Sequence, residues 1–112
     1  MARQKTTSYK ATSPSFGEWL RQLREEKELP LRAVAAAAEM DQAHLSKVEL
    51  GQRLLTADQA AAIARFFKVD ATETEARRIA EKFCMDHANN PAAAQALQIL
   101  NDAPLNAGKK HS

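Results

Sequence analysis

The chain has 112 residues, enough for one domain with a modest core. Alanine supplies much of the 45% hydrophobic content, and glycine and β-branched residues are few, so the composition favours an all-α fold over a sheet. A net charge of +2 excludes a strongly basic domain, the single cysteine excludes an intrachain disulfide, and no apolar run reaches the ~20 residues of a membrane span.

The N-terminal segment, residues 1–14, is polar and unperiodic, and its basic residues Arg3, Lys5 and Lys10 meet no acid. We expect a flexible basic arm, which is either an unstructured terminus or a segment that follows phosphates or a minor groove of DNA. It lacks the apolar stretch of a secretory signal, which together with the lone cysteine favours a cytoplasmic location.

The first two helices are marked by their ends. Ser15 and Glu18 form an S-x-x-E capping box, which begins a helix with an apolar stripe at 3.6-residue spacing. Pro30 ends this helix, because proline disfavours α geometry at the preceding residue, and it is tolerated at the start of the next helix. Glu39 then occupies a turn that often requires positive φ, which costs a residue other than glycine about 1 kcal/mol.

A third helix is predicted over residues 41–50. Asp41 is expected to cap its first turn through the side chain, and Gly51 to close it in a left-handed conformation. Leu45 and Val48 point into the core, so the opposite side of the helix is polar and faces outward.

Further helices follow to the end of the chain. Thr56 and Gln59 form a second capping box, which begins a fourth helix. A fifth helix follows Asp70 or Thr72, and a sixth begins near Asn90, which precedes a proline at the first helical position. The tail over residues 104–112 is expected to be flexible.

Residues 16–70 resemble the helix-turn-helix domain of the phage-repressor type, a family that includes lambda repressor and the XRE-like regulators. The string A-x(9)-L-S-K-V-E-x-G, from Ala35 to Gly51, carries the resemblance. The resemblance implies an all-α, five-helix domain over residues 15–70, with a helical extension over residues 71–103. In such a unit the second helix of the motif enters the major groove while the first crosses the DNA backbone.

The polar front of the third helix carries the side chains that we expect to read DNA. Gln42 can bond bidentately to adenine, Lys47 can donate to guanine or to a phosphate, and Ala43 can touch a thymine methyl group. His44 and Ser46 can reach a phosphate or a base. The alternative for each polar residue is an ordinary solvated helix face.

The resemblance implies further contacts around this helix. It implies an ion pair between Arg24 and Glu49 that fixes the tilt of the recognition helix and holds Arg24 near a phosphate. It also implies phosphate contacts from Gln52 and Arg53 in the following loop, and from Arg32 near the start of the second helix. The alternative for Arg24 and Glu49 is two unrelated surface charges.

Two departures from the family pattern bear on binding. Leu31 stands where the family usually has a phosphate-binding glutamine, and Arg32 is the possible substitute. Leu54 and Leu55 stand in a loop that often carries proline, and we expect them to be exposed and covered by a partner.

A single domain of this kind makes few phosphate contacts, so binding at cellular salt favours a dimer that reads half-sites about 34 Å apart. We expect a two-fold interface built by apolar residues of the last two helices: Ile79, Phe83, Leu97 and Leu100. The alternative is that these residues cover the domain's own core.

Cys84 and His87 have the i,i+3 spacing of metal ligands, but two ligands are too few for a zinc site. We expect no metal and no cofactor, and we expect Cys84 to be a small buried apolar residue. No Ser/His/acid or Cys/His set and no glycine-rich phosphate loop is present, so we expect no enzyme.

The leading hypothesis is a sequence-specific DNA-binding transcription regulator, a homodimeric repressor that binds a palindromic operator in double-stranded DNA. It would lie in the cytoplasm, associated with the nucleoid, and not on a membrane. The alternative is a protein-interaction module, such as an antitoxin or adaptor, that binds a partner protein through the last two helices.

Overall fold

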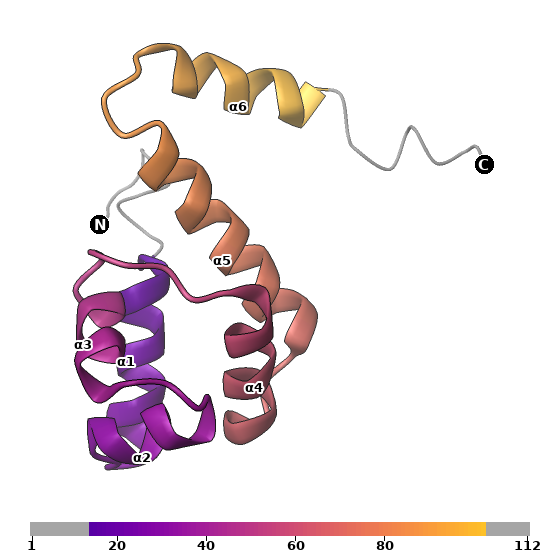
Figure 1. Ribbon diagram of the computed structural model, residues 1–112. Coiled ribbons are helices and arrows are strands. Elements are labelled where there is room, and N and C mark those ends of the chain that lie inside the picture. The colour runs from indigo at the N-terminus through magenta and orange to yellow at the C-terminus, as the bar shows by residue number, and fades with distance from the viewer. Residues whose placement is uncertain (1–13, 103–112) are drawn as a thin grey trace, which may run out of the picture. The chain divides into compact units, whose positions relative to one another are not determined.

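The computed structural model describes residues 14–102, and all regular secondary structure in this range is helical (Figure 1). The helices are α1 (Phe16–Glu26), α2 (Leu31–Ala37), α3 (Gln42–Glu49), α4 (Ala57–Phe67), α5 (Ala71–Asp86) and α6 (Ala92–Asp102). The all-α class, with a helical extension after the helix-turn-helix, is therefore confirmed. The expected basic arm, except Pro14, and the expected tail lie outside the described residues.

The chain divides into two compact units, one up to Lys82 and the other from Phe83 onward. In the first unit, α3 packs against α1 and α2, and α4 packs against α2 (Figure 1). Its core is built from the apolar sides of α1 to α4. The largest fully buried apolar side chains are Leu20, Val34, Leu45, Val48, Leu55 and Ile63. Each such side chain contributes about 1.5–3 kcal/mol by leaving water.

Leu55 corrects one expectation. Its side chain is buried in the core and Leu54 is half-buried, so the expected exposed leucine pair does not exist. In the loop before α4, Leu55 therefore extends the core of its own unit.

The N-terminal caps form at α1 and α4 but not at α3. The Ser15 Oγ accepts the Glu18 N–H at 3.2 Å and the Glu18 carboxylate accepts the Ser15 N–H, which confirms the first capping box. Thr56 and Gln59 form the second in the same way. Asp41 has the extended conformation of an N-cap residue, but its side chain accepts no amide of α3. The expected side-chain cap of α3 is therefore wrong.

Four helices end in the same backbone motif, in which a residue in the left-handed conformation follows the last turn. Gly51 holds this position after α3 with φ 81°, as predicted. Glu39 holds it after α2 with φ 54°, which confirms the expected positive φ. Glu28 and Lys68 hold it after α1 and α4 with φ 55° and 58°. Because Glu28 turns the chain, α1 already ends at Glu26, before the position at which Pro30 would end it.

Within the first unit, α5 buries part of its polar side and exposes its apolar side, the reverse of an ordinary amphipathic helix. Thr74 is buried and its hydroxyl donates to the Asp70 carbonyl at 2.8 Å, whereas Ala76, Ile79 and Ala80 are exposed. The helix therefore packs through polar side chains and leaves its apolar stripe uncovered within its own unit.

In the second unit, Cys84 is exposed, so the expectation that it is buried is wrong. The rings of Phe83 and His87 contact each other in a tilted arrangement, with centroids 4.7 Å apart. The α6 helix contains no buried residue. Within residues 14–102, none of the helices has the length and apolar character needed to cross a membrane.

Candidate nucleic-acid interface

The front face of α3 consists of Gln42, Ala43 and Lys47, and all three residues are exposed. On the opposite side, Leu45 and Val48 are fully buried and anchor the helix to the core. Burial of that side alone would still allow the helix to tilt on the core. Further contacts are therefore needed to fix the direction of the front face.

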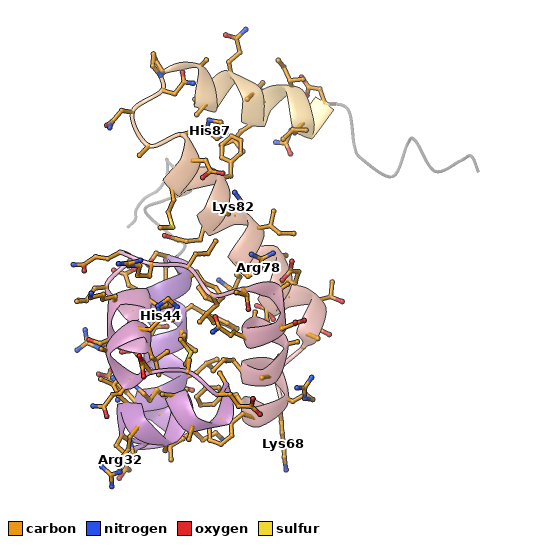
Figure 2. All side chains as sticks on the ribbon, viewed as in Figure 1. Arg32, His44, Lys68, Arg78, Lys82 and His87 are labelled. Atoms are coloured by element: carbon orange, nitrogen blue, oxygen red, sulfur yellow. The ribbon has the colours of Figure 1, made fainter. Side chains whose placement is uncertain are left out.

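His44 and Ser46 lie between these two sides of α3 and are half-buried. Figure 2 labels His44 on this helix. Leu50 follows at the C-terminal end of the helix, and its side chain is 66% exposed. Ala43, Lys47 and Leu50 have i,i+4,i+7 spacing, so Leu50 extends the exposed stripe of the helix. The sequence analysis did not single out Leu50, because an apolar residue close to the buried Val48 is readily read as part of the core stripe.

An ion pair between Arg24 of α1 and Glu49 of α3 fixes the C-terminal end of α3. Arg24 Nε donates to one Glu49 carboxylate oxygen at 2.7 Å, and Nη2 donates to the other at 3.0 Å. The two side chains are only 15% and 6% exposed. The bidentate bond to Glu49 and the charge of that carboxylate raise the pKa of Arg24 above its ordinary value, against the opposing effect of burial.

Arg24 also holds the end of its own helix. Its Nη1 donates to the Leu29 carbonyl at 2.9 Å, so every nitrogen of the guanidinium makes a bond within the protein. The planar group therefore links the end of α1 to the end of α3, and its charge is already balanced by Glu49.

Gly17 of α1 provides a second fixed point for α3. A Cβ atom at Gly17 would collide with the Val48 carbonyl oxygen and would lie 2.7 Å from the Glu49 carbonyl oxygen. Only glycine therefore allows the first turn of α1 to approach the last turn of α3 so closely. Sequence reasoning missed this contact, although a glycine inside a helical pattern costs about 1 kcal/mol relative to alanine and so indicates a packing reason.

The expected phosphate-binding residues fall into two groups. Arg32 at the start of α2 is exposed, as are Gln52 and Arg53 directly after α3, and Figure 2 shows Arg32 pointing away from the body of the unit. Arg24 differs, because it is mostly buried and already bonded. Leu31, which stands where the family usually has glutamine, packs against the hydrophobic core.

The four residues expected at a dimer interface are divided between the two units. Ile79 is 54% exposed in the first unit, and it does not cover that unit's core. In the second unit Leu100 is 47% exposed, while Phe83 and Leu97 are half-buried.

Ile79 also lies at an apolar groove between α4 and α5, with a volume of about 460 Å³. Most of the lining side chains are alanines: the groove is formed by Ala57, Ala60, Ala61, Ala71, Thr72, Glu75, Ala76 and Ile79. Apart from Thr72 and Glu75 the groove is lined by apolar side chains, and Ala76, Ile79 and Ala80 of α5 are exposed beside it.

In the part of the chain that the structure describes, no three His, Cys, Asp or Glu residues come together in a way that could hold a metal ion. The exposed residues around α3 offer hydrogen-bond donors and cations on a rigidly held helix. Such groups can form hydrogen bonds and ion pairs with a polar or anionic partner.

Comparison with known protein families matches residues 15–76, more than half of the chain, to the helix-turn-helix domain. A comparison with curated proteins found no match. The matched segment begins at the first capping box and ends within α5, so it contains α1 to α4 and the front face of α3.

Proposed function

Because the chain belongs to the helix-turn-helix family, we propose that it is a sequence-specific DNA-binding transcription regulator. In this proposal α3 is the recognition helix and lies in the major groove, while α2 crosses the DNA backbone. More finely, we propose a regulator of the phage-repressor (XRE) type that acts as a repressor in the cytoplasm, at the nucleoid.

One observation carries the proposal: α3 exposes a polar front face while its tilt is fixed from behind. Gln42 and Lys47 project from a helix whose far end is held by the Arg24–Glu49 pair. Base readout requires donors and acceptors at defined positions, because a bidentate pair discriminates between bases only when its geometry is good. A solvated helix face with no partner would not require such a fixed tilt.

We assign base contacts to the front face and phosphate contacts to the residues around it. Gln42 pairs with adenine, Lys47 with guanine, and Ala43 with a thymine methyl group. We assign phosphate or base contacts to His44, Ser46, Arg32, Gln52 and Arg53, which are exposed or half-buried polar residues. Arg24 contributes through its hold on Glu49.

We propose that two copies form a dimer through the apolar stripe of α5, with Ile79 and Phe83 on α5 and Leu97 and Leu100 on α6. The exposure of Ile79 beside an alanine-lined groove supports this, since a large apolar surface on a small unit favours association. A two-fold dimer would present two copies of α3 to a palindromic operator.

Selection of bound sequences from random DNA tests the proposal with the full chain. The expected result is a palindromic sequence that the wild type binds tightly. Lys47→Ala should then weaken binding without unfolding the protein, and Gln42→Ala should relax the preference at one base pair by about 1–3 kcal/mol.

Lys68→Asn is the matched control for the loss of a cation. Figure 2 shows Lys68 at the end of α4, away from His44 on α3, and asparagine tolerates the positive φ of this position. The control should bind the selected duplex like the wild type. Equal binding by Lys47→Ala, Gln42→Ala and the wild type would reject α3 as the recognition helix.

A further inference from the structure

The first turn of α1 contacts both α5 and the recognition helix. The Phe16 N–H donates to a carboxylate oxygen of Glu81 on α5 at 3.2 Å. The next residue, Gly17, lies against the carbonyl oxygens of Val48 and Glu49 at the end of α3. Two successive residues of α1 therefore join the helix that carries the exposed apolar stripe to the helix that carries the front face.

The Glu81 contact is directional, because it satisfies a specific amide. The first amides of a helix have no partner within the helix, and at α1 the capping box satisfies those of Ser15 and Glu18. Glu81 satisfies that of Phe16 from another helix and places a negative charge at the positive end of the α1 dipole. A hydrogen bond restrains angle and distance, whereas an apolar contact would allow sliding.

Two arginines of α5 add further polar contacts to the same unit. The Arg77 guanidinium lies 4.8 Å from the centre of the Trp19 ring on α1, and Glu73 holds it there with bonds of 2.9 and 3.1 Å. Arg78 donates to the Leu55 carbonyl at 3.5 Å. The orientation of α5 on α1 is thus set by polar contacts, and the apolar stripe takes no part in it.

We propose that Glu81, supported by Arg77, is a positioning residue that sets the angle, within the first unit, between the recognition helix and the exposed apolar side of α5 at Ile79. In a two-fold dimer this angle fixes the separation and rotation of the two copies of α3. Glu81 therefore determines which half-site spacing the dimer accepts. The inference rests on the proposed function of a DNA-binding dimer.

The test uses the full chain and duplexes that carry two copies of the selected half-site. Their spacing is the selected one, or one base pair longer or shorter, and each base pair turns the half-site by about 34°. We expect the wild type to lose at least about tenfold in affinity at either altered spacing, because a rigid dimer cannot follow the rotation.

Glu81→Ala should bind the selected spacing about five- to tenfold more weakly, and should lose no more than about threefold further at the altered spacings. A duplex with one half-site should bind wild type and Glu81→Ala equally. Glu81→Gln keeps an oxygen that accepts the Phe16 N–H, so it should retain the spacing preference. Glu26→Ala, which removes the same charge from an exposed position of α1, should behave like the wild type.

A Glu81→Ala protein that folds and prefers one spacing as strongly as the wild type would overturn the inference and leave the proposed function intact. Should this variant not fold, Arg77→Gln is measured in the same assay. Loss of the spacing preference would support the inference, and a preference as strong as that of the wild type would overturn it. A wild type that binds DNA without preference for spacing would overturn both the inference and the dimer. A wild type that binds no duplex would overturn the proposed function, and the inference with it.

Discussion

A single side chain, Arg24, serves the candidate DNA surface without facing it. Its guanidinium bonds Glu49 at two atoms and the Leu29 carbonyl at a third, in a largely buried position. Removing one partner of such a pair leaves a charge that has lost both water and its counter-charge. The pair therefore fixes the tilt of α3, and losing either partner should also destabilise the unit.

We expect Arg24→Ala to lower the free energy of unfolding by about 3 kcal/mol, because Glu49 is left buried and unpaired. Arg21→Ala is the matched control, since Arg21 pairs with Glu25 at 2.9 Å while both side chains are more than half exposed. It should cost less than about 0.5 kcal/mol. Urea titrations followed by circular dichroism measure both values, and equal losses would mean that the Arg24 pair is no more than a surface contact.

Glu39 offers a test of backbone strain at a single residue. It adopts φ 54° in the turn between α2 and α3, so Glu39→Gly should raise the free energy of unfolding by up to about 1 kcal/mol. Ala36→Gly, at an exposed position inside α2, should lower it by about 1 kcal/mol. Thermal melts compare the two variants, and the prediction fails if both shift the melting temperature in the same direction.

At the scale of the helices, the crossing of α1 and α3 depends on Gly17. Gly17→Ala should destabilise the protein by about 1–3 kcal/mol, because the new methyl group meets backbone atoms that cannot rotate away. It should also weaken DNA binding, because α3 must shift.

Gly51→Ala separates this steric effect from a conformational one. No atom lies within 4 Å of a Cβ at Gly51, so alanine there should cost only about 1 kcal/mol for the positive φ and should leave the crossing unchanged. Unfolding titrations and duplex binding on both glycine variants check the prediction. A Gly17→Ala protein as stable as the wild type, with unaltered binding, would contradict it.

The starts of α1 and α4 were predictable from sequence, whereas the ends of these two helices were not. The capping boxes at Ser15 and Thr56 place side chains with a known geometry at fixed spacing, so both starts were correctly predicted. The ends of α1 and α4 depend on Glu28 and Lys68 in a left-handed conformation. These residue types do not favour that conformation, and only the packing of the whole unit imposes it.

The contacts of α5 within the first unit were also not predictable from the sequence. Periodicity located the apolar stripe around Ile79 but did not say which face of the helix the body would cover. The body covers the polar face through Arg77 and Glu81, whose partners lie more than fifty residues away in the chain. The front face of α3 was easier to propose, because Leu45 and Val48 define its opposite side within a single helix.

At the scale of the whole molecule, the exposed stripe of α5 leads to a prediction about assembly. Ile79→Glu should weaken self-association by at least about tenfold, because a charge would be buried in the proposed interface. Phe66→Glu, which places the same charge at an exposed apolar position of α4, should leave self-association unchanged. Sedimentation equilibrium on both variants and the wild type measures the effect. A monomeric wild type at high concentration would exclude the dimer.

The central claim is that α3 reads DNA with its front face. The most direct measurement is an NMR titration of the full chain with the selected duplex, followed through the backbone amides. The account predicts that the largest shift changes fall on residues 42–47 and on Arg53, with smaller changes at Arg32. Saturable binding whose changes are confined to α5 and α6, while residues 42–47 do not move, would contradict it.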